Sequence, residues 1–520
     1  MSELASERVS QRVPGHDATP PARRRSTLVG NAGGLIGSRV VVAALGWAGT
    51  LLIARTLTVP EFGTFVLVFT VLGLMSVVTD MSLGRVVVGG LVDPDRDRAR
   101  FAGAYILLRT ALGLVGYGVA VGFTVLAGYP DSVVRAMALA GVVVVVATPS
   151  AAVNGIYEAH LRTGRVAVAE VLGRSAQLAL TVAVVAAGGR LVWLIVPAIV
   201  AELVAIAWKL VPLRRVMPIT WAVDGRLWRA MLVEAVPLSL GAALTTVTYR
   251  IDTVMLSMLA DLDAVAVYGV AYKFVELLAF VPQALVTALL PLLVRHWPVD
   301  PDGFHRELRR AWTLLLVVMG LAVVEFLLFA RPVLGLLYGA HYTVAATAAR
   351  VVVASQLLAA VVVVGLTVLV ALGRHRAYPW VALLGLALNV AANLVAIPRY
   401  SYEGAAVATL ATDAFVLVLI GVLLHRADPD LPGPPWVRVG AAALGAGAAG
   451  WALGRVAPWP VAAAAVVPVY AGLLLAVRIA GPGGVRRLLA PTRAAAPGTP
   501  RSAAPGEPRP ADHHHEEEER

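Results

Sequence analysis

Long, unbroken runs of apolar residues constrain this chain more than any other feature of its sequence. Each run has about 20 residues or more, which is enough for a helix to cross a bilayer. Of the 520 residues, 59% are hydrophobic and 14% are charged, and the mean hydropathy is +0.79. A water-soluble domain of this composition would expose large apolar patches and aggregate. A transmembrane β-barrel is also excluded, because its strands alternate apolar and polar residues.

The sequence therefore predicts an all-α polytopic membrane protein with about 14 transmembrane helices. The expected spans are 31–53, 62–80, 101–126, 133–154, 166–187, 191–212, 230–259, 264–294, 311–330, 346–372, 377–397, 403–425, 437–456 and 460–479. The segment 331–345 is expected to form a short re-entrant or interfacial piece. Residues 1–28 and 481–520 are expected to be disordered cytoplasmic tails, because their polar or Ala/Pro-rich composition cannot bury a core.

The net charge of +11 follows from the topology. Most of the 43 lysines and arginines lie in the two tails and in every second loop, beginning with the cluster Arg23–Arg25. Cytoplasmic loops of membrane proteins are enriched in these residues. This distribution predicts an even number of spans with both termini in the cytoplasm. Nucleic-acid binding is not needed to explain the basic charge.

The chain is expected to consist of two similar halves. The first six spans begin near Asn31 and the second six near Pro237, an offset of about 205 residues. Each half has an even number of spans, so the halves share one orientation and are related by a pseudo-two-fold axis along the membrane normal. The expected parts are an N-terminal six-helix bundle (29–212), a cytoplasmic linker (213–229), a C-terminal six-helix bundle (230–425) and two additional helices (426–480).

Several short stretches, taken in their order and spacing, resemble the polysaccharide (O-antigen type) flippases of the multidrug/oligosaccharidyl-lipid/polysaccharide (MOP) exporter superfamily. They are Leu51–Leu57, Pro60–Gly63, Asp80–Gly84, Arg250–Leu256, Tyr268–Lys273, Leu289–Pro291, Leu337–Gly339 with Tyr342, Asn393, Ile397–Tyr400 and Glu403–Ala406. The resemblance covers about residues 28–425. It departs from the family at Ala266 and Ser401, where the family usually has glycine.

This resemblance implies a flippase that moves a polyprenyl-pyrophosphate-linked oligosaccharide across the bacterial cytoplasmic membrane by alternating access. The implied partners are this lipid-linked glycan, membrane lipids and glycan-assembly enzymes. The lipid II flippases are a sister group, so the resemblance leaves the identity of the glycan open.

Charged residues inside the spans are the candidate site, because each costs about 2.5–3.5 kcal/mol at mid-bilayer unless it has a partner or water. Arg39, Arg109 and Arg174 lie about eight residues into spans that start on the cytoplasmic side. Their common depth predicts a basic ring in the cavity, and guanidinium groups suit phosphate oxygens. In the resembling family, a pyrophosphate headgroup enters such a cationic cavity. The alternative is that each side chain extends back to the interface, and Arg174 has Glu170 one turn away.

Other charges in the second half have two interpretations each. Lys273 is a candidate phosphate contact, but Glu276 lies at i+3 and can neutralise it on the same helix face. Arg250 and Asp252 are two residues apart, so they point to different faces and each needs a separate partner, water or cargo. They are candidates for the cavity or for structural pairing between helices.

Three lone acids lie near the middle of their spans, at Glu202, Glu325 and Asp413. Together with Asp252 and Glu276, they are candidate coupling or cavity acids, since a buried carboxyl group can carry a coupling proton or cation. The alternative role is hydrogen-bonded packing.

Enzyme activity is not expected. The chain has no cysteine, no glycine-rich phosphate loop with lysine and no HExxH motif. We therefore expect no catalytic residue, no cofactor and no metal. Two other functions remain as alternatives: a cation-coupled multidrug exporter of the same superfamily, and a membrane glycan polymerase or scaffold. Arginines at cavity depth disfavour the exporter, and short outer loops disfavour the polymerase.

Overall fold

The computed structural model describes residues 22–80, 82–93 and 96–477, and every element in this part of the chain is a helix. The predicted all-α class is confirmed. The elements are α1 (Ala22–Thr56), α2 (Val59–Asp80), α3 (Leu83–Val92), α4 (Arg98–Leu126), α5 (Asp131–Ala159), α6 (Thr163–Ala186), α7 (Leu191–Leu210), α8 (Leu213–Val216), α9 (Gly225–Leu259), α10 (Leu262–Leu278), α11 (Phe280–His296), α12 (Pro301–Tyr338), η1 (Ala340–Ala345), α13 (Ala346–Ala371), η2 (His375–Ala377), α14 (Tyr378–Ala427), α15 (Trp436–Leu453) and α16 (Trp459–Ala476). Residues 22–28 were predicted to belong to a disordered tail, but they are helical because α1 begins at Ala22. Residues 1–21 and 481–520 of the predicted tails lie outside the described residues.

The number of spans is close to the predicted 14. By length and composition, 11 helices of the described chain can cross a membrane, or 12 if the bent pair Gly225–Pro237 and Ser239–Leu259 is one span. Helix α14 has 50 residues and contains a non-helical residue, Ser401, with φ of 49°, so it comprises two spans. The 18-residue α15 lies beside α16 but is not among the helices that meet this length and composition criterion.

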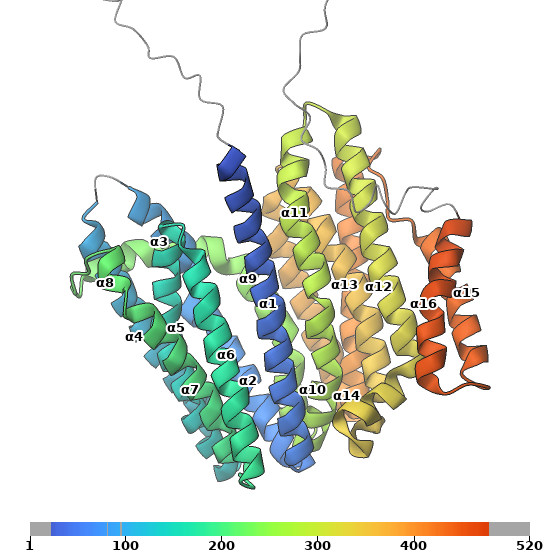
Figure 1. Cartoon of the computed structure of the whole chain (residues 1–520), viewed down its shortest axis with the longest axis horizontal. Coiled ribbons are helices and arrows are strands. Elements are labelled where there is room, and N and C mark those ends of the chain that lie inside the picture. The colour runs from blue at the N-terminus through green and yellow to red at the C-terminus, as the bar shows by residue number, and fades with distance from the viewer. Residues whose placement is uncertain (1–21, 81, 94–95, 478–520) are drawn as a thin grey trace, which may run out of the picture.

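The helices form two halves side by side, with α1–α7 in one and α9–α14 in the other (Figure 1). Helices α15 and α16 lie at the outer edge of the second half, where their buried residues join the apolar core of α12 and α13. Each half packs mainly within itself, through contacts such as α4 with α5 and α13 with α14. The predicted arrangement of two bundles with two appended helices is therefore confirmed.

We call the side on which α1 begins the tail face, at the top of Figure 1, and the side on which α1 ends the far face. The two halves are in tight contact near the far face. A Cβ atom on Gly63 of α2 would lie 1.8 Å from the carbonyl oxygen of Leu262, at the start of α10. One turn deeper, Val66 fills the space beside Gly269. The two glycines let the backbones of α2 and α10 approach closely.

Polar and aromatic contacts also join the halves near the far face. The Arg55 Nε donates to the carbonyl oxygen of Leu337 at 2.6 Å, which satisfies a free carbonyl at the end of α12. The Tyr129 and Ser257 hydroxyls are 2.6 Å apart. One apolar core contains buried residues of both halves. The halves are therefore closed at the far face.

Helix α9 connects the halves and is bent by 65° near Pro237. Its first limb packs on the first half, where Met231 and Ala235 join the buried core of α3, α4 and α5. The Trp228 Nε1 donates to the Ala104 carbonyl at 2.9 Å, and Arg100 pairs with Asp224 at 2.8 Å. The second limb packs on α14 and α2. The packing of the first half thus extends beyond residue 212.

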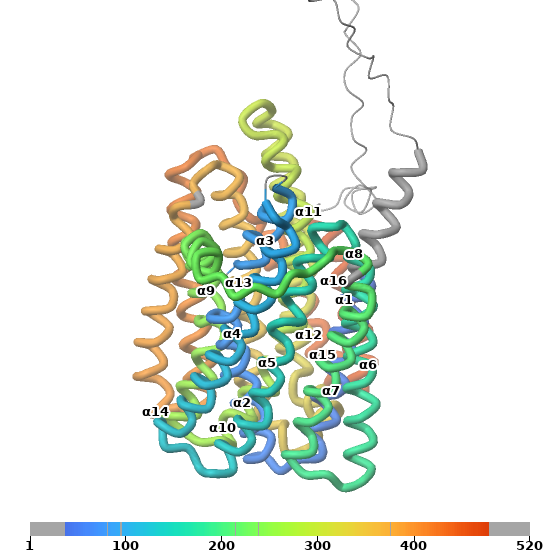
Figure 2. The backbone as a smooth tube through the Cα atoms, turned by 90° about the vertical axis from the view of Figure 1, so that its left-hand side faces the viewer, coloured from blue at the N-terminus to red at the C-terminus, as the bar shows by residue number. Residues whose placement is uncertain are grey.

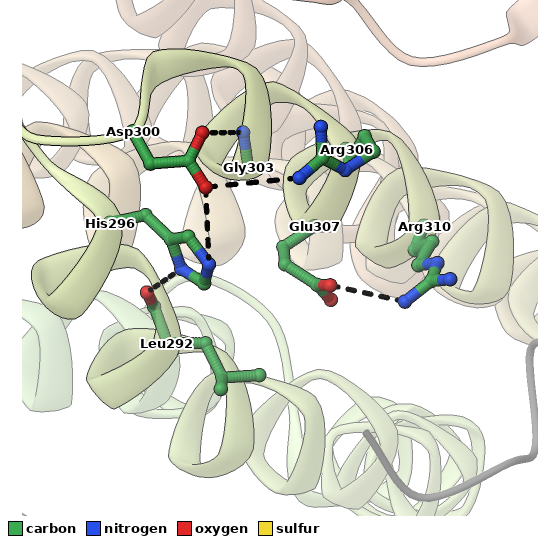
Figure 3. Close-up of polar contacts among 7 residues, drawn as sticks. All are labelled: Leu292, His296, Asp300, Gly303, Arg306, Glu307 and Arg310. Carbon is green, nitrogen blue, oxygen red and sulfur yellow. Dashed lines mark hydrogen bonds and ion pairs between the residues drawn. The ribbon is translucent and has the colours of Figure 1, made fainter. Parts of the chain in front are cut away.

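The hairpin of α11 and α12 projects beyond its neighbours at the tail face in Figures 1 and 2. Figure 3 shows its polar contacts. Asp300 caps α12 by accepting a hydrogen bond from the Gly303 backbone nitrogen at 2.8 Å, and it lies 3.8 Å from both His296 and Arg306. Glu307 pairs with Arg310 at 3.0 Å. The charges near the turn of this hairpin therefore partly compensate one another.

Two local features differ from the expectation. The segment 331–345 is no separate re-entrant piece, because α12 continues to Tyr338 and a short 3-10 helix leads directly into α13. The eighth span, expected at 264–294, is one candidate span over Leu262–His296, but its helix is interrupted at Ala279 between α10 and α11.

Candidate functional site

Arg39 lies on α1, which runs between the two halves in Figure 1. It is exposed, and it has no hydrogen bond or ion pair with any other residue that the structure describes. Glu158 on α5 interacts electrostatically with Arg39, with Glu170 and with Asp80. The guanidinium group of Arg39 is thus available to a ligand, but acidic residues lie nearby.

Arg109 on α4 is 4% exposed and is already paired. Its Nη1 lies 2.6 Å from Oδ1 of Asp80, the last residue of α2, and 3.3 Å from the carbonyl oxygen of the same residue. The Asp80 side chain is 66% exposed. This pair presents a carboxylate, rather than a free guanidinium group, at the surface. Asp80 is a site residue that the sequence did not indicate.

Replacing Arg109 with alanine is expected to destabilise the protein. Its buried Nε already lacks a partner, and its pairing with Asp80 joins α4 to the end of α2. Loss of a charge-assisted hydrogen bond of this kind costs about 1.5–3 kcal/mol. We expect a lower melting temperature in detergent for R109A than for R310A, which removes an exposed pair on α12. Equal melting temperatures would show that Arg109 does not stabilise the fold.

Arg174 on α6 is exposed, and its Nη1 donates to Oε1 of Gln177 at 2.7 Å. Glu202 on α7 interacts electrostatically with Arg174 and with Lys209. The three arginines of the predicted ring therefore lie in a region that also contains several acids. Its character is mixed rather than purely cationic.

Arg250 on α9 lies at the interface between the halves. Its guanidinium group packs against Gly73 of α2, where a Cβ atom would lie 2.7 Å from the Arg250 Nε. Within the described chain, Arg250 has no hydrogen-bond or ion-pair partner. Lys273 on α10, by contrast, pairs with Glu276 at 2.7 Å. Arg39 and Arg250 are therefore the free guanidinium groups among the predicted site residues.

Asp252 is the centre of a buried polar cluster in the second half. It is 2% exposed, and it accepts hydrogen bonds from Tyr268 at 3.1 Å, from Asn393 at 2.7 Å and from Thr409 at 2.7 Å. These donors come from α10 and from both spans of α14. No cationic side chain within the described residues contacts this carboxyl group.

The remaining two acids have fewer partners. Asp413 on α14 accepts a hydrogen bond from the hydroxyl of Ser355 on α13. Glu325 on α12 has a buried carboxyl oxygen, Oε1, with no partner in the described structure.

A cavity of about 330 Å³, which we call the C-half cavity, opens beside Asp413. It is bounded by α9, α10, α11, α13 and α14. Its polar residues include Ser355, Gln356 and Asn389, and its aromatic residues are Tyr249, Tyr272 and Tyr378. The rest of the lining is mainly apolar, and no lysine, arginine or histidine contributes to it.

Two halves closed at one face, with the unpaired guanidinium group of Arg250 at their interface, define a membrane protein of the transporter type. The profile of the polysaccharide biosynthesis protein family matches residues 28–297, and the profile of the MatE family matches residues 237–395. Since the first match covers more than half of the chain, the chain belongs to the polysaccharide biosynthesis protein family, within the MOP superfamily.

Solved structures share this fold. A lipid II flippase, MurJ, in an inward closed conformation matches with a TM-score of 0.73 and 12% identity, over 84% of this chain and 97% of that one. A multidrug resistance MATE family transporter in an inward-facing conformation matches with a TM-score of 0.60 and 13% identity, over 75% and 96%. A MOP superfamily transporter from Pyrococcus furiosus gives 0.52 and 15%, over 76% and 94%. No curated protein matches the sequence.

Proposed function

We propose that this protein is a flippase that carries a polyprenyl-pyrophosphate-linked oligosaccharide across the bacterial cytoplasmic membrane by alternating access. The cargo headgroup enters between the two halves, and the prenyl tail stays in the lipid. The protein acts as a transporter without catalytic residues, cofactor or metal. Its partners are the lipid-linked glycan, membrane lipids and the enzymes that assemble the glycan.

The free guanidinium groups of Arg39 and Arg250 are the main observation that supports this proposal. They lie on the first helix of each half, and Arg250 faces α2 across the interface. A guanidinium group binds phosphate oxygens through two parallel hydrogen bonds. We propose that the pyrophosphate group engages the two guanidinium groups together or one after the other as it passes between the halves. Three further basic residues already have polar partners: Arg109, Arg174 and Lys273. They contribute to cargo binding through their positive electrostatic potential, or by exchanging their present partners for the pyrophosphate.

The closed far face supports the direction of transport. We place both termini and the tail face in the cytoplasm, following the distribution of basic residues. Cargo then enters from the cytoplasmic side while the far face is closed, and it leaves after the α2–α10 contact separates. A family described by its role in polysaccharide biosynthesis is consistent with a glycan cargo.

Binding of cargo fragments to the purified protein tests this proposal. We expect a short-chain prenyl pyrophosphate to bind, the corresponding monophosphate to bind about tenfold or more weakly, and the prenyl alcohol not to bind. Binding of an organic cation with no binding of the pyrophosphate would instead support the multidrug exporter.

We further propose that Asp252 couples transport to a proton or cation gradient, with Asp413 and the partly buried Glu202, Glu276 and Glu325 as secondary acids. An uncompensated carboxyl group inside a membrane protein is typical of ion pathways. In D252N, transport is expected to continue at a basal rate but to lose its dependence on an imposed proton or sodium gradient. The control is D302N, which changes an exposed acid on α12. An unchanged gradient dependence in D252N would exclude this role.

A further inference from the structure

The two halves hold a basic and an acidic side chain at equivalent positions. Ser355 follows Ser150 by 205 residues, and Asp413 follows Lys209 by 204, which agrees with the offset of the repeat. Ser150 and Ser355 lie on the fourth span of their halves, and Lys209 and Asp413 on the sixth. Each serine hydroxyl hydrogen-bonds to the charged side chain of its own half. The first half thus has an ammonium group where the second half has a carboxyl group.

In the first half, the ammonium group of Lys209 is enclosed by oxygen atoms. Lys209 is 2% exposed, and its Nζ donates to the hydroxyl and the carbonyl of Ser150 and to the side-chain oxygen of Asn154 at 3.0 Å. The buried Tyr157 packs nearby and donates to the Lys209 carbonyl at 2.8 Å. The side chain of Lys209 is a four-carbon chain that ends in an ammonium group. It therefore occupies the first half in the way that an alkylammonium ligand would.

The second half has smaller residues at the equivalent positions. Residues 205 positions after Asn154 and Tyr157 are Ala359 and Val362, and both line the C-half cavity together with Ser355 and Asp413. Volume that side chains fill in the first half is thus left open in the second. The acid at its end has no basic partner among the described residues.

From this comparison we infer that the C-half cavity is a binding site for a primary alkylammonium ligand. The ammonium head binds Asp413 and Ser355, as the Lys209 ammonium binds Ser150, and the alkyl chain lies along the apolar wall of α13. From Ser355 to Val370 this wall is about 22 Å long at 1.5 Å per residue. This site goes beyond the proposed function, which gives Asp413 only a secondary role in ion coupling and places the anionic cargo elsewhere.

The chemistry of the lining favours this class of ligand over others. A carboxyl group without a basic neighbour, in a membrane-embedded cavity, attracts cations and repels phosphates. The rings of Tyr249 and Tyr272 offer cation–π contacts to an ammonium group. The apolar wall suits an alkyl chain, whereas a sugar needs hydrogen-bond partners on all sides.

The absence of cysteine from the chain gives a direct test. In the purified full-length A359C variant, the rate of modification by methyl methanethiosulfonate is measured with increasing n-hexylammonium, n-hexanol or hexanoate. We expect hexylammonium to slow the modification at least fivefold and the other two to leave it unchanged. In A359C/D413N, about tenfold or more hexylammonium should be needed for the same protection. The control reporter is S76C, an exposed position on α2 outside this cavity.

Each other outcome would overturn the inference. Equal protection by hexanol would show that the cavity binds alkyl chains without recognising the ammonium group. Protection by sodium ions, with no effect of hexylammonium, would show that it binds an inorganic cation. Absence of modification in A359C would show that the cavity is closed to ligands. A failure of prenyl pyrophosphate binding would contradict the proposed function but not this site, because the two tests use different probes.

Discussion

Replacing Gly63 with alanine is expected to open the far face and to slow transport about tenfold or more. The added Cβ atom would lie 1.8 Å from the carbonyl oxygen of Leu262 and 2.7 Å from its carbonyl carbon. Both are backbone atoms, so no side-chain rotation relieves the overlap. Helices α2 and α10 must therefore separate, and the closed state of the halves becomes less stable relative to the open one.

A reporter cysteine measures this separation. Val66 packs between the halves beside Gly269, and cysteine is smaller than valine. In V66C/G63A, a water-soluble thiol reagent should react about tenfold or more faster than in V66C alone. The matched control is G118A, because a Cβ atom on Gly118 of α4 has no neighbour within 4 Å. Equal rates with and without G63A would mean that the α2–α10 contact does not close the far face.

Removing the free guanidinium groups is expected to produce the largest loss of cargo transport. Each charge-assisted hydrogen bond to a phosphate contributes about 1.5–3 kcal/mol. R39A and R250A should therefore each lower the initial transport rate at low cargo concentration about 10- to 100-fold. R39K and R250K should recover only part of the loss, since lysine keeps the charge but not the paired donors.

R309A is the control for this series, because Arg309 is an exposed arginine on the α12 hairpin, away from the interface between the halves. Its transport rate should equal that of the unmodified protein. If R39A and R250A also transport at that rate, the two guanidinium groups do not bind the cargo.

The fold was largely predictable because each helix that crosses the membrane needs about 20 mostly apolar residues, and such runs are visible in the sequence. The span expected at 264–294 corresponds to α10 and α11 together, and the spans at 377–397 and 403–425 are the two parts of α14. The break at Ser401 was visible as the polar stretch between two runs. The joint at Ala279 also has a sequence signal, because Pro282 cannot donate a hydrogen bond to the carbonyl oxygen of residue 278 and so interrupts the helix.

The site was less predictable because its contacts join residues that are distant in the sequence. The pairing of Lys273 with Glu276 followed from helical spacing, as i and i+3 share one face. The pairing of Arg109 with Asp80 spans 29 residues, so periodicity could not indicate it. The role of Lys209 emerged only when the halves could be compared, although the repeat offset was already visible in the sequence.

Transport of a labelled lipid in liposomes tests the central claim most directly. Purified protein is reconstituted, and a fluorescent polyprenyl-pyrophosphate oligosaccharide is followed from one leaflet to the other by a membrane-impermeant quencher. We predict transfer that depends on the protein and is abolished in the R39A/R250A double variant. No transfer of this lipid, with retained exchange of an organic cation for protons, would contradict the account and identify the protein as an exporter.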